Sequence, residues 1–265
     1  MGQFVTNDGV RLNFVEKGSG RPLLMIPGWG ASSRWFNAQL DGLSDQLHVI
    51  ALDQRFHGGS DRPAHGARVA RTAKDVHELL EALALDDVVL LGWSIGVATV
   101  LSYFDLFGSD RIGRFVTVCG GSKPLNDDAW TLGFTDVAGA VGFKALAAAD
   151  PSALAHANVP TYFVARPAEA ELEWMIADTA NLPAAAADLA FDCIVLDFRD
   201  ALRRLDRPTL AIFGEQDHVI PVANAEFVAG ALPGVRCEIF QASGHCPFIE
   251  EAERFNQVLG EFAAG

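Results

Sequence analysis

The amino-acid sequence predicts an α/β fold in which a mostly parallel central sheet is flanked by helices and carries an inserted helical cap. Short continuous apolar runs alternate with helical patterns over the first 120 residues, and strands buried on both faces give such runs. This alternation indicates right-handed strand–helix–strand crossovers. It stops between about 122 and 205, where Ala-rich helical stretches and prolines dominate, and it resumes at Pro208.

The first part of the chain is expected to form a hairpin followed by alternating strands and helices. Residues 4–6 and 10–16 alternate around Asn7-Asp8-Gly9, and Asp-Gly is a strong hairpin signal. The segment 69–83 reads as an amphipathic helix with one apolar stripe. The other expected elements are strands at 23–26, 48–52, 88–91 and 112–118, and helices at 35–47 and 95–107.

The long middle segment is interpreted as a cap. Helical stretches at 137–149, 169–180 and 184–189 are separated by prolines. An ordinary crossover helix with long loops is the alternative, but structureless connections of this length are rare in compact domains. We therefore expect a core made of 1–121 and 206–265, with 122–205 inserted as the cap. The core is expected to close with strands at 208–213 and 235–240 and a helix near 252–262.

A serine stands at a predicted sharp turn between a buried strand and a helix. Gly92-Trp93-Ser94-Ile95-Gly96 directly follows the apolar run 88–91 and precedes the helical stretch 97–107. Such a turn holds the serine in a strained conformation with its hydroxyl exposed, and the positions two before and two after it must be very small. The following helix directs its N-terminal amides at the oxygen charge that develops during attack. Ser94 is therefore the expected nucleophile.

A carboxylate and a histidine follow Ser94 in the chain order that this turn requires. Asp217 lies just after the strand-like run 208–213, and His245 lies just after 235–240. Loops at the carboxyl ends of strands are where open α/β sheets gather their chemistry. We expect His245 to take the Ser94 proton and Asp217 to orient the imidazole. Glu215 is the alternative acid.

At these motifs the chain resembles the α/β-hydrolase superfamily, and the resemblance covers nearly its whole length. Residues 24–30 resemble the family's oxyanion loop, and residues 51–60 resemble its Asp-x-Arg-x-x-Gly-x-Ser turn. Within the superfamily the chain looks most like small bacterial serine esterases and cofactor-free haloperoxidase-type proteins. The resemblance implies an α/β-hydrolase fold and an oxyanion hole formed by the backbone N–H groups of Trp29 and Ile95.

Two positions depart from the pattern that is frequent in the family. Pro27 occupies a position that is often histidine, and Val97 follows the turn where a second glycine is common. Neither change removes a backbone donor that the oxyanion hole needs. The departures leave the subfamily open and do not affect the expected fold.

Three further polar residues lie close to these motifs and are expected to be structural. Asp53 is expected to brace loops through the arginine of its own turn, and His57 is expected to brace the same turn. His218 adjoins Asp217, but neighbouring side chains in a loop normally diverge.

Aromatic side chains are expected to form an apolar substrate pocket. Trp29 and Trp93 flank the oxyanion loop and the nucleophile, so both are candidates for its lining. Core packing is the alternative for these and for the aromatic residues of the cap. The cap candidates are Phe134, Phe143, Tyr162, Phe163 and Trp174. An aromatic, mostly uncharged cap suits a neutral, moderately hydrophobic ester or lactone.

These features predict a serine hydrolase that cleaves a small to medium, neutral, apolar carboxylic ester or lactone through an acyl-enzyme at Ser94. This chemistry needs no metal and no cofactor. The same triad could instead serve C–C bond hydrolysis, lyase chemistry or perhydrolysis, or the protein could bind a ligand without turnover. An aspartate-dependent dehalogenase or epoxide hydrolase is disfavoured because the nucleophile position holds Ser94.

Composition narrows the partners. The net charge of −14 argues against nucleic acid, whose phosphates require clustered Lys and Arg. No run has transmembrane length and no signal peptide is visible, so we expect a cytoplasmic protein with a small-molecule substrate and no membrane contact. The four cysteines lack metal-site spacing; Cys119 and Cys237 are expected to be buried, and Cys246 is expected to pack rather than react. The oligomeric state stays open.

Overall fold

The computed structural model describes residues 1–265 and contains one eight-stranded sheet. The strand order is β1-β2-β4-β3-β5-β6-β7-β8, with antiparallel pairing from β1 through β2 to β4 and parallel pairing in the rest. The predicted mostly parallel α/β sheet and its N-terminal hairpin are therefore confirmed. The strands are β1 (Gly2–Val5), β2 (Arg11–Lys17), β3 (Arg21–Ile26), β4 (Leu47–Leu52), β5 (Val88–Trp93), β6 (Ile112–Val118), β7 (Thr209–Gly214) and β8 (Arg236–Phe240).

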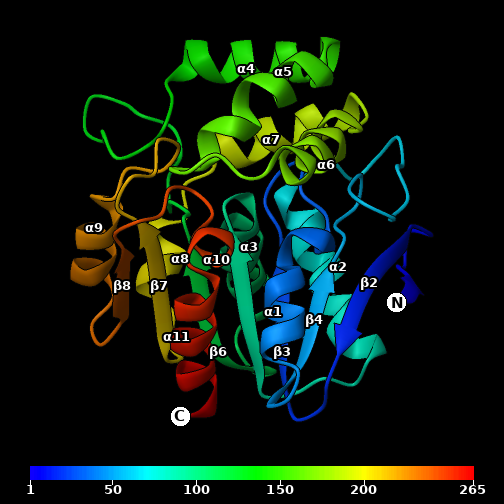
Figure 1. Ribbon diagram of the computed structural model, residues 1–265, viewed down its shortest axis with the longest axis vertical. Coiled ribbons are helices and arrows are strands. Elements are labelled where there is room, and N and C mark those ends of the chain that lie inside the picture. Colours follow the sequence, from blue (N-terminus) through cyan, green and yellow to red (C-terminus); the bar gives the residue numbers. More distant parts are fainter.

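Helices cover both faces of the sheet (Figure 1). On one face lie α2 (Val69–Ala82), α3 (Ile95–Phe107), α8 (Arg199–Arg203) and α9 (Asn224–Ala231). On the other lie α1 (Asn37–Gly42), which continues the short 3-10 helix η1 (Ser33–Phe36), then α10 (Pro247–Glu250) and α11 (Ala252–Ala264). The helix expected at 35–47 is thus shorter and begins as a 3-10 turn.

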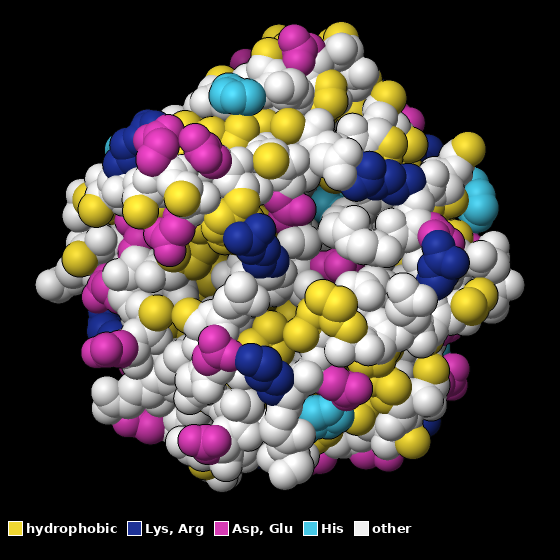
Figure 2. Space-filling view, turned by 45° about the vertical axis from the view of Figure 1, so that its right-hand side comes forward, with side chains coloured by type: hydrophobic (Ala, Val, Ile, Leu, Met, Phe, Trp, Pro, Cys, Tyr) yellow, Lys and Arg dark blue, Asp and Glu magenta, His cyan; other side chains and the backbone are white.

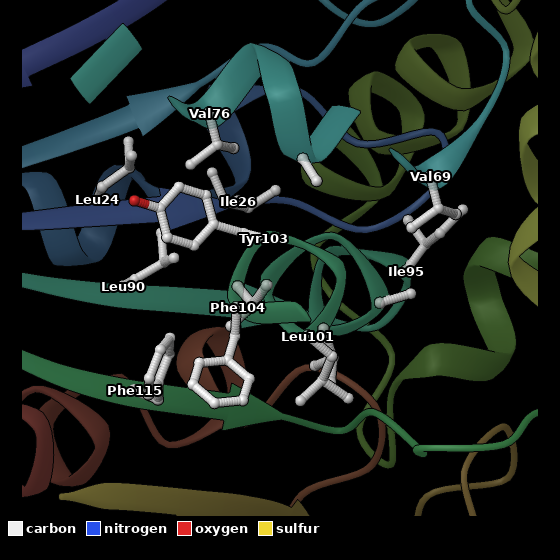
Figure 3. Close-up of a cluster of buried hydrophobic side chains, with 14 of the residues drawn as sticks. Leu24, Ile26, Val69, Val76, Leu90, Ile95, Leu101, Tyr103, Phe104 and Phe115 are labelled. Carbon is white, nitrogen blue, oxygen red and sulfur yellow. The ribbon is translucent and has the colours of Figure 1, made fainter. Parts of the chain in front are cut away.

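The core consists of two apolar layers that the strands divide between them. Along β3, Leu24 and Ile26 face the layer under α2 and α3, whereas Leu23 and Met25 face the layer under α1 and α11. This alternation follows from the period of two in a strand, and both sets are buried because helices cover both faces. Figure 3 shows the first layer, where Leu90 of β5 packs near Tyr103 of α3. Each buried Leu or Ile contributes about 1.5–3 kcal/mol.

The segment between β6 and β7 forms helices that lie above the carboxyl ends of the parallel strands (Figure 1). They are α4 (Val137–Ala149), α5 (Pro151–Asn158), the 3-10 helix η2 (Val159–Tyr162), α6 (Glu169–Ala180) and α7 (Ala185–Val195). The next helix, α8, packs instead against α3 and α9 beside the sheet. We therefore propose that the cap ends near 196, before α8, and not at 205.

One cap helix was not expected from the sequence. The sequence predicts that prolines separate the helices of this segment, yet one of them, Pro151, occupies the first turn of α5. A proline is compatible with that position because its missing N–H would have no helical partner there. The carboxylate of Asp150 caps the helix by accepting a hydrogen bond from the Ala153 N–H at 2.8 Å.

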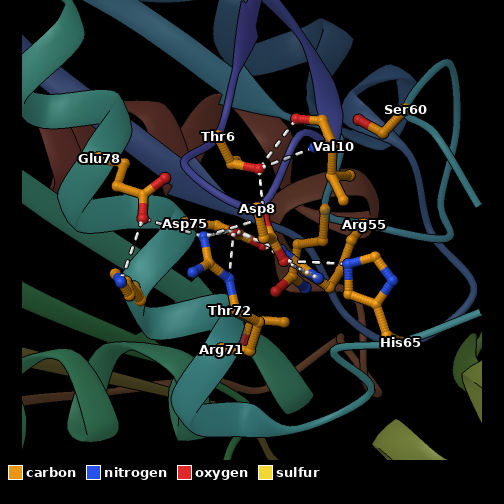
Figure 4. Close-up of polar contacts among 12 residues, drawn as sticks. Thr6, Asp8, Val10, Arg55, Ser60, His65, Arg71, Thr72, Asp75 and Glu78 are labelled. Carbon is orange, nitrogen blue, oxygen red and sulfur yellow. Dashed lines mark hydrogen bonds and ion pairs between the residues drawn. The ribbon is translucent and has the colours of Figure 1, made fainter. Parts of the chain in front are cut away.

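A buried ion-pair network holds the loop after β4 against α2 and the β1–β2 turn (Figure 4). The fully buried guanidinium of Arg55 donates to both carboxylate oxygens of Asp75, at 2.6 and 2.7 Å, and lies 3.3 Å from Asp8. Burial alone would lower the pKa of Arg55, but its hydrogen bonds to Asp75 raise it above the ordinary value. The prediction that Asp53 contacts Arg55 is wrong, because the Arg55 guanidinium pairs with Asp75 and Asp8 instead.

The molecular surface carries both signs of charge. On the face shown in Figure 2, Lys and Arg side chains lie apart from one another among acidic ones and form no continuous basic patch. None of the helices combines the length and the apolar character that spanning a bilayer requires.

Candidate active site

The turn at Ser94 has the strained geometry that its sequence predicts. Ser94 adopts φ 56° and ψ −119° between β5 and α3, in the region that non-glycine residues rarely occupy. A Cβ at Gly92 would lie 2.3 Å from the carbonyl oxygen of Gly96, and a Cβ at Gly96 would lie 2.3 Å from that of Ile26. Both glycines are therefore required for the close approach of strand, turn and helix.

His245 and Asp217 form a buried pair. His245 Nδ1 lies 2.8 Å from Oδ2 of Asp217, and the two side chains are 3% and 1% exposed. The other carboxylate oxygen of Asp217 accepts the N–H groups of Val219 and Ile220 at 2.7 and 3.0 Å. Burial alone would raise the pKa of Asp217, but His245 and these two N–H groups together lower it. Asp217 is therefore an ionised acceptor for the imidazole N–H.

The main chain of His245 is fixed from two sides. Its N–H donates to the carbonyl oxygen of Tyr162 at 2.7 Å, and its carbonyl oxygen accepts the Trp93 indole N–H at 2.8 Å. The Tyr162 bond attaches the end of η2 in the cap directly to the loop that carries the histidine. Cap and core thus share the positioning of this side chain.

The expected oxyanion loop runs beside Ser94. A Cβ at Gly28 would lie 3.1 Å from the Ser94 Cβ, so the loop and the serine are in contact. The loop is held by Asp53, which accepts the Ser33 N–H at 2.6 Å, and by Asp178 of α6, which accepts the Ser32 N–H at 2.9 Å. The N–H groups of Trp29 and Ile95 donate to no acceptor within the protein.

A cavity of about 300 Å³ opens next to Ser94 and His245. Four of the candidate pocket residues line it: Trp29, Phe134, Phe143 and Tyr162. Trp29 is held there by a hydrogen bond from its indole N–H to the Ala186 carbonyl oxygen at 3.1 Å. Most other lining residues are aliphatic, and the lining also contains three polar side chains that the sequence interpretation did not place there: Asn158, Thr161 and His218.

Most of the chain matches the model of one protein family. The family model described as the alpha/beta hydrolase fold matches residues 21–252. The chain belongs to the alpha/beta hydrolase family.

Relatives of this hydrolase extend over its full length. A non-heme haloperoxidase of Rhodococcus erythropolis is 30% identical over 278 residues, covering 98% of both chains. The solved structure of an esterase from Exiguobacterium antarcticum superposes with a TM-score of 0.95 at 26% identity, covering 100% of both chains. A bromoperoxidase structure from Bacillus anthracis gives a TM-score of 0.94 at 25% identity, again covering 100% of both. An esterase-like hydrolase is therefore the class that these relatives support.

Three aromatic residues of this hydrolase lie outside the cavity, although they were predicted to line its pocket. Trp93 is 1% exposed and packs in the core layer on the other face of the sheet. Trp174 lies outside the cavity, in contact with Trp35 at a ring-centroid distance of 5.8 Å and under Arg34 at 4.1 Å. Phe163 is buried in the same core layer as Trp93. Core packing, the alternative for each, is what the structure has.

The other polar candidates take structural or peripheral places. Glu215 is exposed and makes no contact with His245, so it is not the acid of the pair. His57 is buried, with Nδ1 2.8 Å from the Arg55 carbonyl oxygen and no hydrogen-bond partner at Nε2. Burial lowers the pKa of His57, so it is neutral and braces the turn. His218 turns toward the cavity while Asp217 turns toward His245.

A cysteine completes the surroundings of the Asp217–His245 pair. Cys119, just after β6, is fully buried at φ 44°, and its Sγ lies within 4.8 Å of ligand atoms of both residues. Three such groups could hold a metal, but burial and the charge of Asp217 raise the pKa of Cys119 well above its ordinary value. A neutral thiol is a poor metal ligand, and the Asp217 oxygens already accept hydrogen bonds. Cys246 is likewise buried with a raised pKa and packs, whereas Cys237 is only half-buried.

Proposed function

We propose that this protein is a serine hydrolase that cleaves a small to medium, neutral, apolar carboxylic ester or lactone through an acyl-enzyme at Ser94. The observation that carries the proposal is the buried Asp217–His245 pair at 2.8 Å, whose histidine lines the same cavity as the strained Ser94. A serine hydroxyl is a poor nucleophile until a neighbouring base accepts its proton, and this arrangement supplies an oriented base.

In the first half-reaction, Ser94 Oγ attacks the carbonyl carbon of the ester while His245 takes the hydroxyl proton. The carbonyl oxygen becomes an oxyanion, which accepts hydrogen bonds from the N–H groups of Trp29 and Ile95. Each such donor is worth about 3 kcal/mol to the transition state. Collapse of the tetrahedral intermediate breaks the bond to the alcohol oxygen, and His245 returns its proton to that oxygen as the alcohol leaves.

In the second half-reaction, water attacks the acyl-enzyme and His245 accepts the proton of the water. The intermediate collapses to a carboxylic acid and regenerates the Ser94 hydroxyl. For a lactone the alcohol and the acid stay joined, and the product is one hydroxy acid. Asp217 keeps the imidazole in one tautomer and stabilises its protonated form in both halves. The protein contributes a covalent nucleophile, proton transfer and hydrogen bonding to this sequence.

The cavity supports the proposed substrate class. Its volume of about 300 Å³ is at the low end for small-molecule sites and suits a short or medium ester. Most of its lining is aliphatic or aromatic, and no Lys or Arg side chain borders it. A carboxylate or phosphate on the substrate would have no cation to pair with there, so a neutral substrate is favoured.

A second acceptor for the acyl group is supported by the relatives named haloperoxidase and bromoperoxidase. Hydrogen peroxide could attack the same acyl-enzyme in place of water and leave as a peroxy acid, a perhydrolysis. Product analysis of an ester reaction run with and without hydrogen peroxide distinguishes the two, because only perhydrolysis yields the peroxy acid.

The proposal is tested by labelling with a fluorophosphonate probe and locating the adduct by mass spectrometry. We expect an adduct on Ser94 of the wild type and a labelling rate at least about 10³-fold lower in His245→Ala. His156→Ala is the matched control, because His156 is an exposed cap histidine outside the cavity, and it should label at the wild-type rate. Ser94→Ala should lose turnover of p-nitrophenyl butyrate by several orders of magnitude while staying folded. A folded wild type that takes no label would contradict the proposal.

A further inference from the structure

The two walls of the cavity differ in polarity. The wall next to the oxyanion loop, here called the apolar wall, is built from Trp29 and from cap residues of α4 and α7: Phe143, Ala190 and Ile194. Trp29 packs edge-on against Phe143 at a centroid distance of 5.2 Å. The only hydrogen-bonding side-chain group among these four residues is the Trp29 indole N–H, and it is already used by the Ala186 carbonyl oxygen.

The wall next to His245, here called the polar wall, contains Asn158, Thr161 and His218 together with the apolar Val219 and Ile220 and the Tyr162 ring. Asn158 and Thr161 belong to the α5–η2 turn, which ends at Tyr162. Because the Tyr162 carbonyl oxygen accepts the His245 N–H at 2.7 Å and its ring lies 5.2 Å from the imidazole, this turn is anchored beside the histidine. His218 directly follows Asp217, which holds the same imidazole.

The polar wall has free hydrogen-bonding capacity. The side-chain amide of Asn158 makes no hydrogen bond to another residue, although it is only half-exposed. The Thr161 hydroxyl donates to the Asn158 carbonyl oxygen at 2.7 Å, which leaves its oxygen able to accept. An apolar group placed here would displace water from these groups and leave them unpaired, whereas a hydroxyl or carbonyl group would pair with them.

The proposed reaction orients the ester between the two walls. His245 returns its proton to the alcohol oxygen, so the alcohol half must lie next to His245, and the acyl half then extends toward Trp29. We infer that the hydrolase selects esters whose acyl half is apolar and whose alcohol half carries a neutral hydroxyl or carbonyl group, recognised by Asn158 and Thr161. This inference rests on the proposed function and adds the chemistry of each half of the substrate.

The test compares two esters with the same acyl group, glycerol monobutyrate and butyl butyrate. The measured quantity is the ratio of their kcat/KM values, because a general loss of activity affects both and cancels. We expect a ratio above one for the wild type. Asn158→Leu and Thr161→Val remove a polar group at nearly constant size, and each should lower the ratio by about fivefold, the effect of one neutral hydrogen bond. Ser152→Ala, an exposed position on α5, is the control and should keep the wild-type ratio.

A second ester pair checks the orientation. Ethyl 3-hydroxybutyrate and ethyl butyrate differ only in a hydroxyl on the acyl half, which should be disfavoured against the apolar wall, so the hydroxylated ester should be the poorer substrate. If Asn158→Leu and Thr161→Val leave the monobutyrate ratio unchanged, or if the acyl hydroxyl improves the substrate, the inference is overturned while the esterase proposal stands. If the folded wild type hydrolyses none of the four esters, the inference is overturned, and the proposed function is overturned with it when the protein also takes no fluorophosphonate label.

Discussion

Gly96→Ala should destabilise the protein, because the turn at Ser94 is closely packed. In an unhindered helix, replacing glycine by alanine stabilises by about 0.5–1 kcal/mol. At Gly96, however, the added Cβ would lie 2.3 Å from the Ile26 carbonyl oxygen and 3.0 Å from that of Pro27, whereas ordinary contact begins at 3.4 Å. The chain after β3 must therefore move by about 1 Å. Overpacking of this kind costs about 1–3 kcal/mol, which lowers the Tm of a protein of this size by roughly 2–6 °C.

The same displacement moves the oxyanion loop, because Ile26 and Pro27 lead directly into Gly28 and Trp29. A misplacement of about 1 Å reduces turnover by about 100-fold. Urea unfolding and the fluorophosphonate labelling rate measure the two effects on the same samples. Gly142→Ala in α4 is the matched control: its Cβ would meet nothing within 4 Å, so stability should rise. A Gly96→Ala protein with wild-type stability and labelling would refute the reasoning.

Two further predictions concern pH. Burial holds the pKa of His57 below 6.5, so the unfolded chain binds a proton that the fold does not, and stability falls as pH drops below 6.5. His57→Asn keeps a donor for the Arg55 carbonyl oxygen but does not titrate. Urea unfolding at pH 8 and pH 5 should therefore show a smaller decrease in unfolding free energy for this variant than for the wild type. An equal decrease in both proteins would exclude His57 as its source. For Asp8, burial raises the pKa, but hydrogen bonds from Thr6 and Arg55 lower it to about 2. The wild type should therefore exceed Asp8→Asn in unfolding free energy above about pH 4, and the difference should vanish as pH falls toward 2; a difference independent of pH would contradict this.

The strands and most helices could be predicted because their signals are local. Continuous apolar runs such as 88–91 mark strands covered on both faces, and the helices at 137–149 and 169–180 have the expected bounds. The helix α5 was missed because Pro151 suits a first helical turn as well as a break, and the sequence does not distinguish the two. The partner of Arg55 was also mistaken, since Asp75 comes from a helix twenty positions away in the chain.

Ser94, Asp217 and His245 could be predicted because each lies in a short motif directly after a predicted strand, and such motifs can be recognised in a single sequence. The cavity lining is different, because it depends on how the cap lies over the sheet. Trp93 could have been assigned correctly, because adjacent residues on a strand point to opposite faces, and Ser94 takes the cavity side. No comparable signal places Asn158 or Thr161 beside His245, because the contact that brings them there is a main-chain hydrogen bond of Tyr162.

One helix of the proposed cap is hydrogen-bonded directly to the loop that we propose forms the oxyanion hole. Within α6, Asp178 accepts the Ser32 N–H at 2.9 Å and the Thr179 hydroxyl donates to the Gly30 carbonyl oxygen at 3.1 Å. Both bonded groups follow Trp29 in the loop, so α6 fixes the path of the chain directly after this residue. Under the proposed function, this is the part of the loop whose Trp29 N–H would bind the oxyanion. If the proposed function holds, sequence changes in α6 should therefore alter the rate without contacting the substrate.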